Sequence, residues 1–243
     1  LLDNLKIQNN LIEKSYKFGV KRLLFLGSSC IYPKFAKQPI KENYLLTDYL
    51  ESTNEYYAIA KIAGLKLCEA FRRQYNFDAI TLMPTNLYGP KDNYDPKESH
   101  VMAAFIRKFY EAKKYNKKQV ICWGTGKPLR EFLYVDDLAE ACLFILENWF
   151  PFNNDSKSNP KQDQTCWLNV GSENEISIKN LAEKISRIIS YEGEIIWDTN
   201  MPDGTPRKKL DTRKINKIGW SAKTDLKEGI EKTIKSFEQE IRI

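Results

Sequence analysis

The sequence predicts an α/β protein with a doubly wound, mostly parallel sheet, and two observations carry this prediction. Short apolar runs alternate along the chain with longer segments in which apolar residues recur at helical spacing. Two of those runs, residues 21–27 and 79–84, are almost continuously apolar in their interior and end in Gly or Pro. Such runs are typical of parallel strands that are covered on both faces. The alternation, without an internal repeat, favours an α/β architecture.

The expected helices share apolar residues three and four positions apart, with charged residues between them. In chain order they cover residues 1–18, 55–75, 102–115, 138–149, 178–190, 211–219 and 225–240. Side chains that can cap a helix mark three of the starts. Ser52 and Glu55 form a capping-box pattern, Asp136 can cap the fourth helix, and Ser177 can cap the fifth.

The expected strands are short apolar runs bounded by Gly, Pro, Asn or charged residues. In chain order they cover residues 21–27, 79–84, 120–123, 131–135, 168–170 and 194–197. The segment from 151 to 166 is rich in Asn, Lys, Asp and Ser, and it is expected to be an exposed loop or insertion.

Composition narrows the class of protein. Hydrophobic residues make up 42% and charged residues 29%, and no apolar run is long enough to cross a bilayer. The five cysteines are widely spaced and form no C-x-x-C pair, which argues against a disulfide framework or a metal site and favours a cytoplasmic protein. The net charge of +6 is scattered, so it favours a phosphorylated small substrate at least as much as nucleic acid.

The strongest chemical signal is the pair Tyr57 and Lys61, which lie four residues apart and therefore share one helix face. An ammonium beside a phenol favours the phenolate, which makes the phenol a better proton donor to a ketone during reduction. An isolated pair of this spacing is common by chance and more often reflects packing. Here Ser28 follows the strand at 21–27, where ligands of open parallel sheets bind, although a serine can also serve a turn.

The chain resembles the extended short-chain dehydrogenase/reductase family in the order of its motifs. A strand comes first, then Ser28, and then a helix that carries Tyr57 and Lys61. Within this family, further motifs are similar to those of the GDP-L-fucose synthases and occur in the same order along nearly the whole chain. They are residues 27–34, 57–64, 84–90, 99–101, 123–126, 130–132 and 202–208. The resemblance implies a Rossmann-like fold, an NADPH-dependent oxidoreductase and isomerase, and GDP-4-keto-6-deoxy-D-mannose as the substrate.

The resemblance also implies two groups for epimerisation. Cys30 and His100, the one histidine of the chain, match the cysteine and histidine that exchange protons at C3 and C5 in that family. A thiol and an imidazole suit this task because both exchange protons near neutral pH. Taken alone, Cys30 could equally be a small buried hydrophobic residue and His100 a loop residue.

Binding roles follow from the same resemblance. The cofactor-binding set comprises Tyr57, Lys61, Pro84, Thr85, Asn86, Leu87 and His100. The GDP-sugar set comprises Lys108, Trp123, Arg130 and Asp203. The guanidinium of Arg130 suits a diphosphate. Lys108 stands where relatives have an arginine. Lysine keeps the positive charge but lacks the planar guanidinium that binds two phosphate oxygens at once.

Domain boundaries are expected as follows. The cofactor domain comprises residues 1–90 and 131–150, the substrate domain comprises 91–130 and 168–243, and 151–166 is the loop between them. No G-x-x-G-x-x-G motif occurs, so we expect the first strands and the phosphate loop to precede residue 1.

Two alternatives remain open. One is another sugar-nucleotide epimerase or dehydratase of the extended family, which would share Tyr57 and Lys61 but lack the combination of Cys30 and His100. The other is a non-catalytic nucleotide-binding relative. The joint presence of the candidate catalytic residues argues against it; they are Ser28, Cys30, Tyr57, Lys61 and His100. The resemblance further implies a homodimer, with neither nucleic acid nor a membrane as partner.

Overall fold

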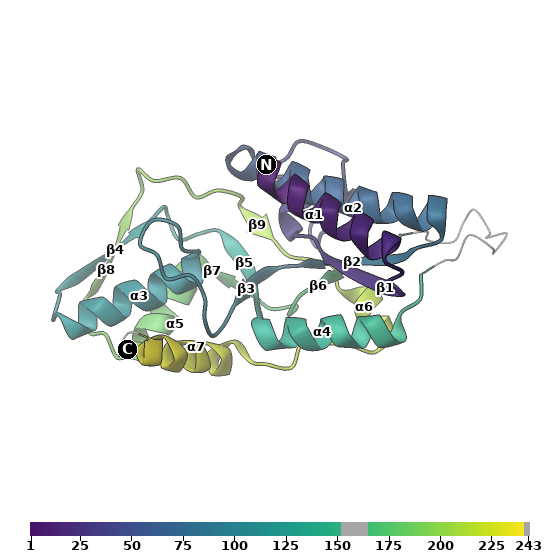
Figure 1. Cartoon of the computed structure of the whole chain (residues 1–243). Coiled ribbons are helices and arrows are strands. Elements are labelled where there is room, and N and C mark those ends of the chain that lie inside the picture. The colour runs from purple at the N-terminus through teal and green to yellow at the C-terminus, as the bar shows by residue number, and fades with distance from the viewer. Residues whose placement is uncertain (152–164, 241–243) are drawn as a thin grey trace. The chain divides into compact units, whose positions relative to one another are not determined.

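The computed structural model describes residues 1–151 and 165–240, which form two compact units (Figure 1). The helices are α1 (Leu2–Lys17), α2 (Glu55–Tyr75), α3 (Val101–Lys114), α4 (Val135–Asn148), α5 (Ile178–Ile189), α6 (Arg213–Ile218) and α7 (Leu226–Glu240). The strands are β1 (Arg22–Leu26), β2 (Asp78–Pro84), β3 (Asn86–Tyr88), β4 (Gln119–Trp123), β5 (Leu129–Tyr134), β6 (Trp167–Val170), β7 (Glu175–Ser177), β8 (Glu194–Asp198) and β9 (Arg207–Lys208). All the expected helices and strands are present, with ends shifted by a few residues.

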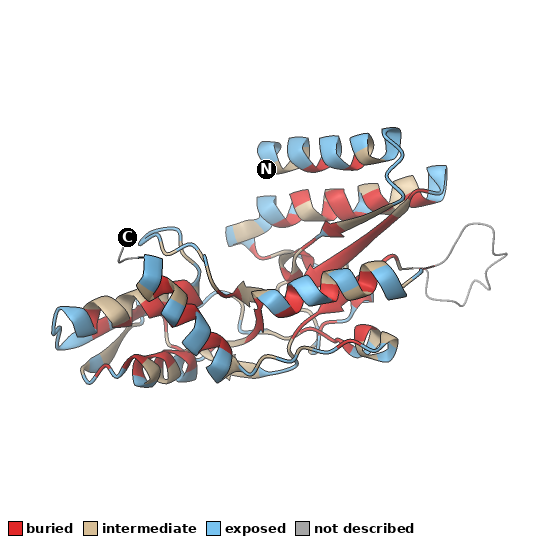
Figure 2. Ribbon diagram, turned by 60° about the horizontal axis from the view of Figure 1, so that its bottom comes forward, coloured by how far each residue is buried: buried red, intermediate tan, exposed pale blue. Residues whose placement is uncertain are grey.

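Unit 1 comprises residues 1–85, 138–173 and 210–221 and contains a parallel sheet in the order β1-β2-β6. The helices α1 and α2 lie on one face of this sheet and α4 on the other (Figure 1). Figure 2 shows that buried residues follow the strands, while the outer face of α1 is exposed. Coverage on both faces explains why β2 is apolar along its whole length.

Unit 2 comprises residues 86–137, 174–209 and 222–243. Here β5 lies between β3 and β7 and also pairs with β9, while β4 and β8 form a separate parallel pair. The apolar sides of α3, α5 and α7 supply most of its core. Fully buried side chains of this core include Phe109, Met102 and Ile106 on α3.

The two units differ from the predicted boundaries at four places. Residues 86–90 belong to unit 2, where β3 pairs with β5. Residues 131–137 belong to unit 2 because β5 pairs with β3, β7 and β9. Residues 168–173 belong to unit 1 because β6 pairs with β2. Residues 210–221 also belong to unit 1, where Leu210 forms a bridge with Ile40. Most of the predicted loop at 151–166, namely 152–164, lies outside the described residues.

Local signals at helix starts were partly right. Ser177 caps α5 as predicted, with its hydroxyl accepting the Asn180 N–H at 3.1 Å. The predicted capping box is wrong, because α2 begins after Asn54 with no side-chain cap. Ser52 instead starts a short 3-10 turn, in which the Glu51 carboxylate accepts the Thr53 N–H at 3.4 Å. Asp136 lies in the first turn of α4 rather than before it.

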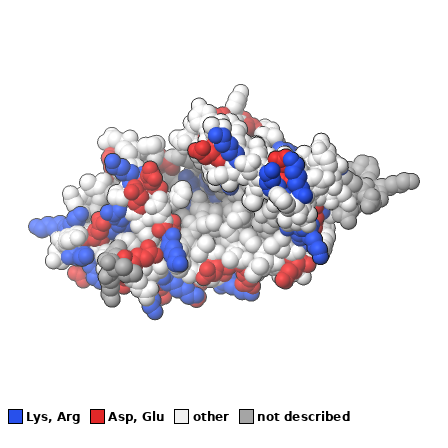
Figure 3. All heavy atoms as spheres, in the orientation of Figure 1, with Lys and Arg blue, Asp and Glu red and all other residues white. Residues whose placement is uncertain are grey.

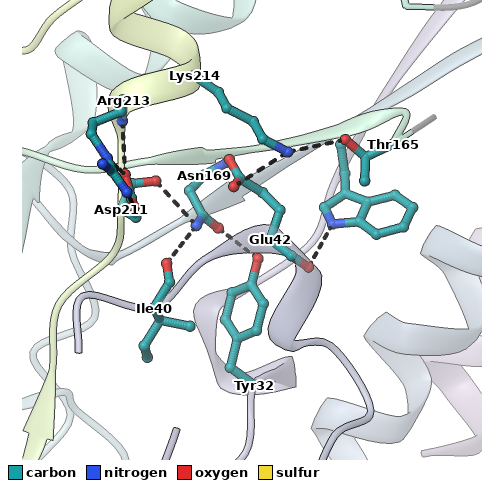
Figure 4. A network of polar contacts seen from close by, with 9 residues as sticks. Tyr32, Ile40, Glu42, Thr165, Asn169, Asp211, Arg213 and Lys214 are labelled. Atoms are coloured by element: carbon teal, nitrogen blue, oxygen red, sulfur yellow. Dashed lines mark hydrogen bonds and ion pairs between the residues drawn. The ribbon is translucent and has the colours of Figure 1, made fainter. Parts of the chain in front are cut away.

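A buried polar network fixes the segment before α6 to the edge of the unit 1 sheet (Figure 4). Asn169 on β6 is fully buried, and its side-chain oxygen accepts a hydrogen bond from Tyr32 at 2.6 Å. Its side-chain amide donates to the carbonyls of Ile40 at 2.9 Å and Asp211 at 3.3 Å. Its backbone N–H donates to Glu42 at 3.2 Å. One residue therefore joins segments that are far apart in the sequence.

We expect Asn169→Ala to lower the free energy of unfolding by about 3 kcal/mol, because it removes the acceptor of the buried Tyr32 hydroxyl and the side-chain donor of the Asp211 carbonyl, while the Ile40 carbonyl keeps only the Asp211 N–H. Urea denaturation followed by circular dichroism measures this loss. Asn148→Ala is the control, since Asn148 is exposed and donates only to the carbonyl one turn earlier. Equal losses in the two variants would show that the network contributes little.

On the face of the molecule drawn in Figure 3, basic and acidic residues are interspersed, and the basic residues are not gathered into one patch. Among residues 1–151 and 165–240, no helix combines the length and the apolar character that crossing a membrane requires. Within the same residues, no cluster of three or more His, Cys, Asp or Glu side chains is arranged to hold a metal ion.

Candidate active site

Ser28 and Cys30 lie in a tight turn directly after β1. Gly27 donates its N–H to the carbonyl of Leu82 on β2 at 2.9 Å, and a Cβ at this position would collide with the sulfur of Met83. Ser28 has an extended backbone, and its hydroxyl accepts the Cys30 N–H at 3.2 Å. The short helical turn Ser29–Ile31 therefore presents Cys30, half-buried, at the carboxyl end of the sheet.

Tyr57 and Lys61 reach the same end of the sheet from α2. The Lys61 ammonium donates to the carbonyl of Leu26, the last residue of β1, at 2.9 Å. Its nitrogen lies 5.1 Å from the ring centre of Phe25 and 5.8 Å from that of Tyr57. The phenol of Tyr57 shares a hydrogen bond with the Ser28 hydroxyl and lies close enough to Cys30 for the two to interact electrostatically. Unit 1 thus brings together its four candidate catalytic residues, Ser28, Cys30, Tyr57 and Lys61.

Gly64 explains how α2 comes so close to β1. A Cβ on Gly64 would lie 2.5 Å from the ring of Phe25, so only glycine fits at this position. The buried side-chain amide of Gln8 on α1 lies against the same glycine and donates to the Ala60 carbonyl at 2.7 Å. Gly64 thus lets both Phe25 and Gln8 approach α2 closely.

The predicted effect of Lys61 on the acidity of Tyr57 is not what this structure shows. Burial raises the pKa of the Tyr57 phenol, and the hydrogen bond with Ser28 only partly offsets this. Burial also lowers the pKa of the Lys61 ammonium. The reason is geometric, because Lys61 points to the Leu26 carbonyl rather than to the phenol oxygen. Tyr57 is therefore held as a neutral phenol, which is the protonation state of a proton donor.

His100 lies in unit 2, immediately before α3. Its backbone carbonyl accepts the first hydrogen bond of the helix from Ala104 at 2.9 Å, while its exposed side chain forms no capping bond. The imidazole is close enough to Asp92 to act electrostatically on its carboxyl group. Sequence reasoning did not single out Asp92, which lies in a polar loop that resembles an ordinary turn.

Lys108 and Trp123 are brought together in unit 2. Lys108 on α3 donates to the Ile121 carbonyl of β4 at 3.0 Å, and its nitrogen lies 5.4 Å from the Trp123 ring centre. The Trp123 side chain is 61% exposed at the end of β4, so its ring is available to a ligand. An exposed indole beside an ammonium can stack on a flat ring and attract an anion.

Arg130 and Asp203 also lie near this end of β4. Both carboxylate oxygens of Asp203 are engaged by Thr125, one by its N–H and one by its hydroxyl, at 2.7 Å each. These bonds lower the pKa of the Asp203 carboxyl group, with Lys127 and Arg130 adding to the effect. In this structure Asp203 shapes the turn after Trp123, whereas the half-buried Arg130 lies on β5 next to it.

Residues 84–87 run across the boundary of the two units, which falls between Thr85 and Asn86. Thr85 is buried and donates its N–H to the Val170 carbonyl of β6 at 3.0 Å. The Asn86 side chain donates to the Glu131 carbonyl at 2.8 Å, and Leu87 continues β3. The run is thus fixed in both units by hydrogen bonds.

The model of the NAD dependent epimerase/dehydratase family matches residues 1–154, which is more than half of the chain. The chain belongs to this family. Among its relatives, a probable GDP-L-fucose synthase 1 of Oryza sativa subsp. japonica is 51% identical over 239 residues, which are 98% of this chain and 69% of that protein. The resemblance to GDP-L-fucose synthases drawn from the motifs is confirmed.

Two solved structures resemble this one along almost its whole length. A GDP-6-OMe-4-keto-L-xylo-heptose reductase from C. jejuni is 35% identical with a TM-score of 0.88, and the match covers 98% of this chain and 76% of that one. A GDP-L-fucose synthetase from Naegleria fowleri bound to NADP is 27% identical with a TM-score of 0.86, and the match covers 99% and 72%. The predicted Rossmann-like α/β fold is confirmed.

Proposed function

We propose that this chain supplies the reactive residues for GDP-L-fucose synthesis: 3,5-epimerisation of GDP-4-keto-6-deoxy-D-mannose, followed by NADPH-dependent reduction at C4. The observation that carries the proposal is the grouping of Ser28, Cys30 and Tyr57 at the carboxyl end of β1. This places a nucleophilic thiol beside a neutral phenol in a chain whose relatives at about half identity are GDP-L-fucose synthases.

The epimerisation is assigned to Cys30 and His100. The C4 ketone makes the hydrogens on C3 and C5 acidic, because the electrons of the broken C–H bond move into an enolate at O4. The Cys30 thiolate takes the proton and becomes a thiol. His100 returns a proton to the opposite face of the carbon, and the enolate collapses to the ketone. Proton exchange with solvent then returns Cys30 to the thiolate and His100 to its protonated form, so one such cycle at each carbon inverts both centres without net oxidation or reduction.

The reduction is assigned to Ser28, Tyr57 and Lys61. The NADPH cofactor supplies a hydride to C4 when it is bound. Tyr57 donates its proton to O4, and its raised pKa keeps that proton in place until the oxygen gains charge. Ser28 shares a hydrogen bond with the phenol and can hold O4 beside it. Lys61, at the carboxyl end of the sheet, has the charge and position to bind a cofactor hydroxyl.

The described residues fit the nicotinamide end of a dinucleotide. The parallel strands β1, β2 and β6 end together, and ligands of open α/β sheets bind beyond such ends. The run from Pro84 to Leu87 continues directly from one of these strands. A phosphate-binding motif is not among the 243 residues, so the chain's own contribution is the reactive end of the site.

For the GDP portion of the substrate we propose Trp123, Lys108 and Arg130. The exposed Trp123 ring offers a stacking surface, and Lys108 beside it supplies positive charge. Arg130 can pair with a diphosphate through its planar fork. Asp203 contributes by fixing the turn at Thr125, because both of its carboxylate oxygens are bound there.

We further propose a cytoplasmic homodimer. Several large apolar side chains on the outer face of α1, including Leu2, Ile7 and Leu11, are more than half exposed, and an apolar surface of this kind suits a second copy of the chain. Sedimentation velocity should give twice the mass of one chain. A monomer at micromolar concentration would contradict the proposal.

The proposal is tested with the full-length protein, the 4-keto substrate and NADPH in deuterated water. NMR of the product should show GDP-L-fucose with deuterium at C3 and C5, and omission of NADPH should leave exchange without reduction. The likeness to the C. jejuni reductase favours a second candidate, a C4 reductase without epimerisation. A reduced product that keeps its C3 and C5 configuration would establish that candidate and refute ours.

A further inference from the structure

The loop between β3 and α3 holds Asp92 and His100 near its two ends. Asn93 accepts the Asp95 N–H at 2.9 Å, and Asp95 accepts the N–H groups of Lys97 and Glu98 at 2.7 and 3.0 Å. These hydrogen bonds fix the backbone in the middle of the loop. They do not involve the side chains of Asp92 and His100.

The loop is also tied to the body of unit 2. Arg107 on α3 donates to the Tyr94 carbonyl at 2.8 Å, and the rings of Tyr94 and Phe237 lie 4.4 Å apart. The loop therefore sits on α3 and α7 rather than extending into solvent. Because His100 begins α3, its position relative to Asp92 is set by the same framework.

One carboxylate oxygen of Asp92 accepts no hydrogen bond from the loop. Its Oδ1 accepts the N–H of Asn93 at 2.7 Å, while its Oδ2 is buried from solvent and has no hydrogen-bond partner. Leaving such an oxygen without a donor is costly, so its presence needs an explanation. The residue lines a cavity of about 180 Å³ together with residues 87–91 and Val135.

His100 is the neighbouring group that can supply the missing donor. Burial raises the pKa of the Asp92 carboxyl group, and the Asn93 N–H and the charge of His100 act against this. The Tyr94 hydroxyl is the other neighbouring donor, but it is itself buried without a hydrogen-bond partner and so does not bind Oδ2. Burial and, after it, the charge of Asp92 raise the pKa of that phenol.

We propose that Asp92 is a positioning residue for His100: its buried Oδ2 accepts the N–H of one ring nitrogen and thereby directs the other ring nitrogen to the substrate. A carboxylate that fixes the tautomer and orientation of a catalytic imidazole is a recurrent arrangement in enzymes. Asp92 itself does not touch the reacting atoms. The inference deepens the proposed function and rests on the role of His100 assigned there.

The test compares Asp92→Asn with wild type in the full-length protein. Asparagine keeps an oxygen for the Asn93 N–H and replaces Oδ2 by an NH₂ group, so the loop can persist while the acceptor is lost. Nitrogen-15 spectra of labelled histidine, assigned with His100→Gln, report the ring tautomer at about pH 8.5, where imidazoles are neutral. We expect one tautomer of His100 to predominate in wild type and that preference to be lost in Asp92→Asn.

Activity provides the second readout. We expect kcat for product formation to fall by about tenfold to a hundredfold in Asp92→Asn with KM nearly unchanged, and Asp92→Glu to recover part of the loss. The matched control is Asp95→Asn, which alters a loop carboxylate that binds only backbone N–H groups. It should keep both the tautomer and kcat.

The outcomes separate the two hypotheses. An unchanged His100 tautomer in both Asp92→Asn and Asp92→Glu would overturn the positioning role, whatever the enzyme makes. Equal effects of Asp92→Asn and Asp95→Asn on kcat would overturn it as well, because the loop fold alone would then explain both. Failure of the wild-type protein to form GDP-L-fucose would refute the proposed function, and the tautomer comparison would still decide the role of Asp92.

Discussion

Cys30→Ser is expected to abolish deuterium exchange at C3 and C5 of the 4-keto sugar, with a loss of about a thousandfold or more. A serine hydroxyl is far less acidic than a thiol, so it is hardly ionised at neutral pH and cannot accept the first proton. The substitution is otherwise mild, because the Cys30 N–H keeps its bond to the Ser28 hydroxyl. Exchange is followed by proton NMR in deuterated water without NADPH.

Cys142→Ser is the matched control, because Cys142 is the other half-buried thiol of the chain. It should exchange both carbons at the wild-type rate. The reducing residues are intact in Cys30→Ser, so slow reduction of the unepimerised ketone to a GDP-6-deoxyhexose is expected there. Normal exchange at both carbons in Cys30→Ser would mean that this thiol is only a packing residue.

Tyr57→Phe is expected to lower NADPH consumption by about a hundredfold to ten-thousandfold while leaving deuterium exchange largely intact. Phenylalanine keeps the ring but has no proton for O4. The ring of Tyr57 is 39% exposed, so the loss of one hydroxyl should have little effect on folding. NADPH oxidation is measured by absorbance, and exchange is measured in parallel by NMR.

The control for this variant is Tyr56→Phe, one residue earlier on α2, where the side chain is 68% exposed. Both activities should stay at the wild-type level in it. If Tyr57→Phe oxidised NADPH as fast as wild type, the proton donor would have to be another group. If it lost exchange as well, the separation of epimerisation from reduction would be wrong.

The sequence predicted the elements well wherever the signal is local. The apolar face of α2, the buried strand β2 and the cap at Ser177 all follow from residues that lie close together in the chain. The capping box at Ser52 failed because Ser52 lies in a short 3-10 turn capped by Glu51, so α2 begins only after Asn54. The strands β3, β7 and β9 were missed because two or three residues are too few to show a period.

Pairing between distant segments could not be predicted in the same way. That β6 belongs beside β2 depends on hydrogen bonds such as Thr85 to Val170, which leave no trace in either segment. The residue types of the candidate site were evident from the motifs, but their environments were not. Lys61 turns to a backbone carbonyl, and burial rather than charge sets the acidity of Tyr57. Asp92 could be distinguished only once its orphaned oxygen was seen.

The turn at Ser28 has a consequence for how the two activities could diverge. Its single hydroxyl holds the segment that presents the thiol and also contacts the phenol, so both halves of the reaction share one atom. A genetic screen for variants that epimerise without reducing should therefore recover changes at Tyr57 and not at Ser28. Descendants specialised in only one of the two steps would be expected to retain this serine long after the other step had been lost.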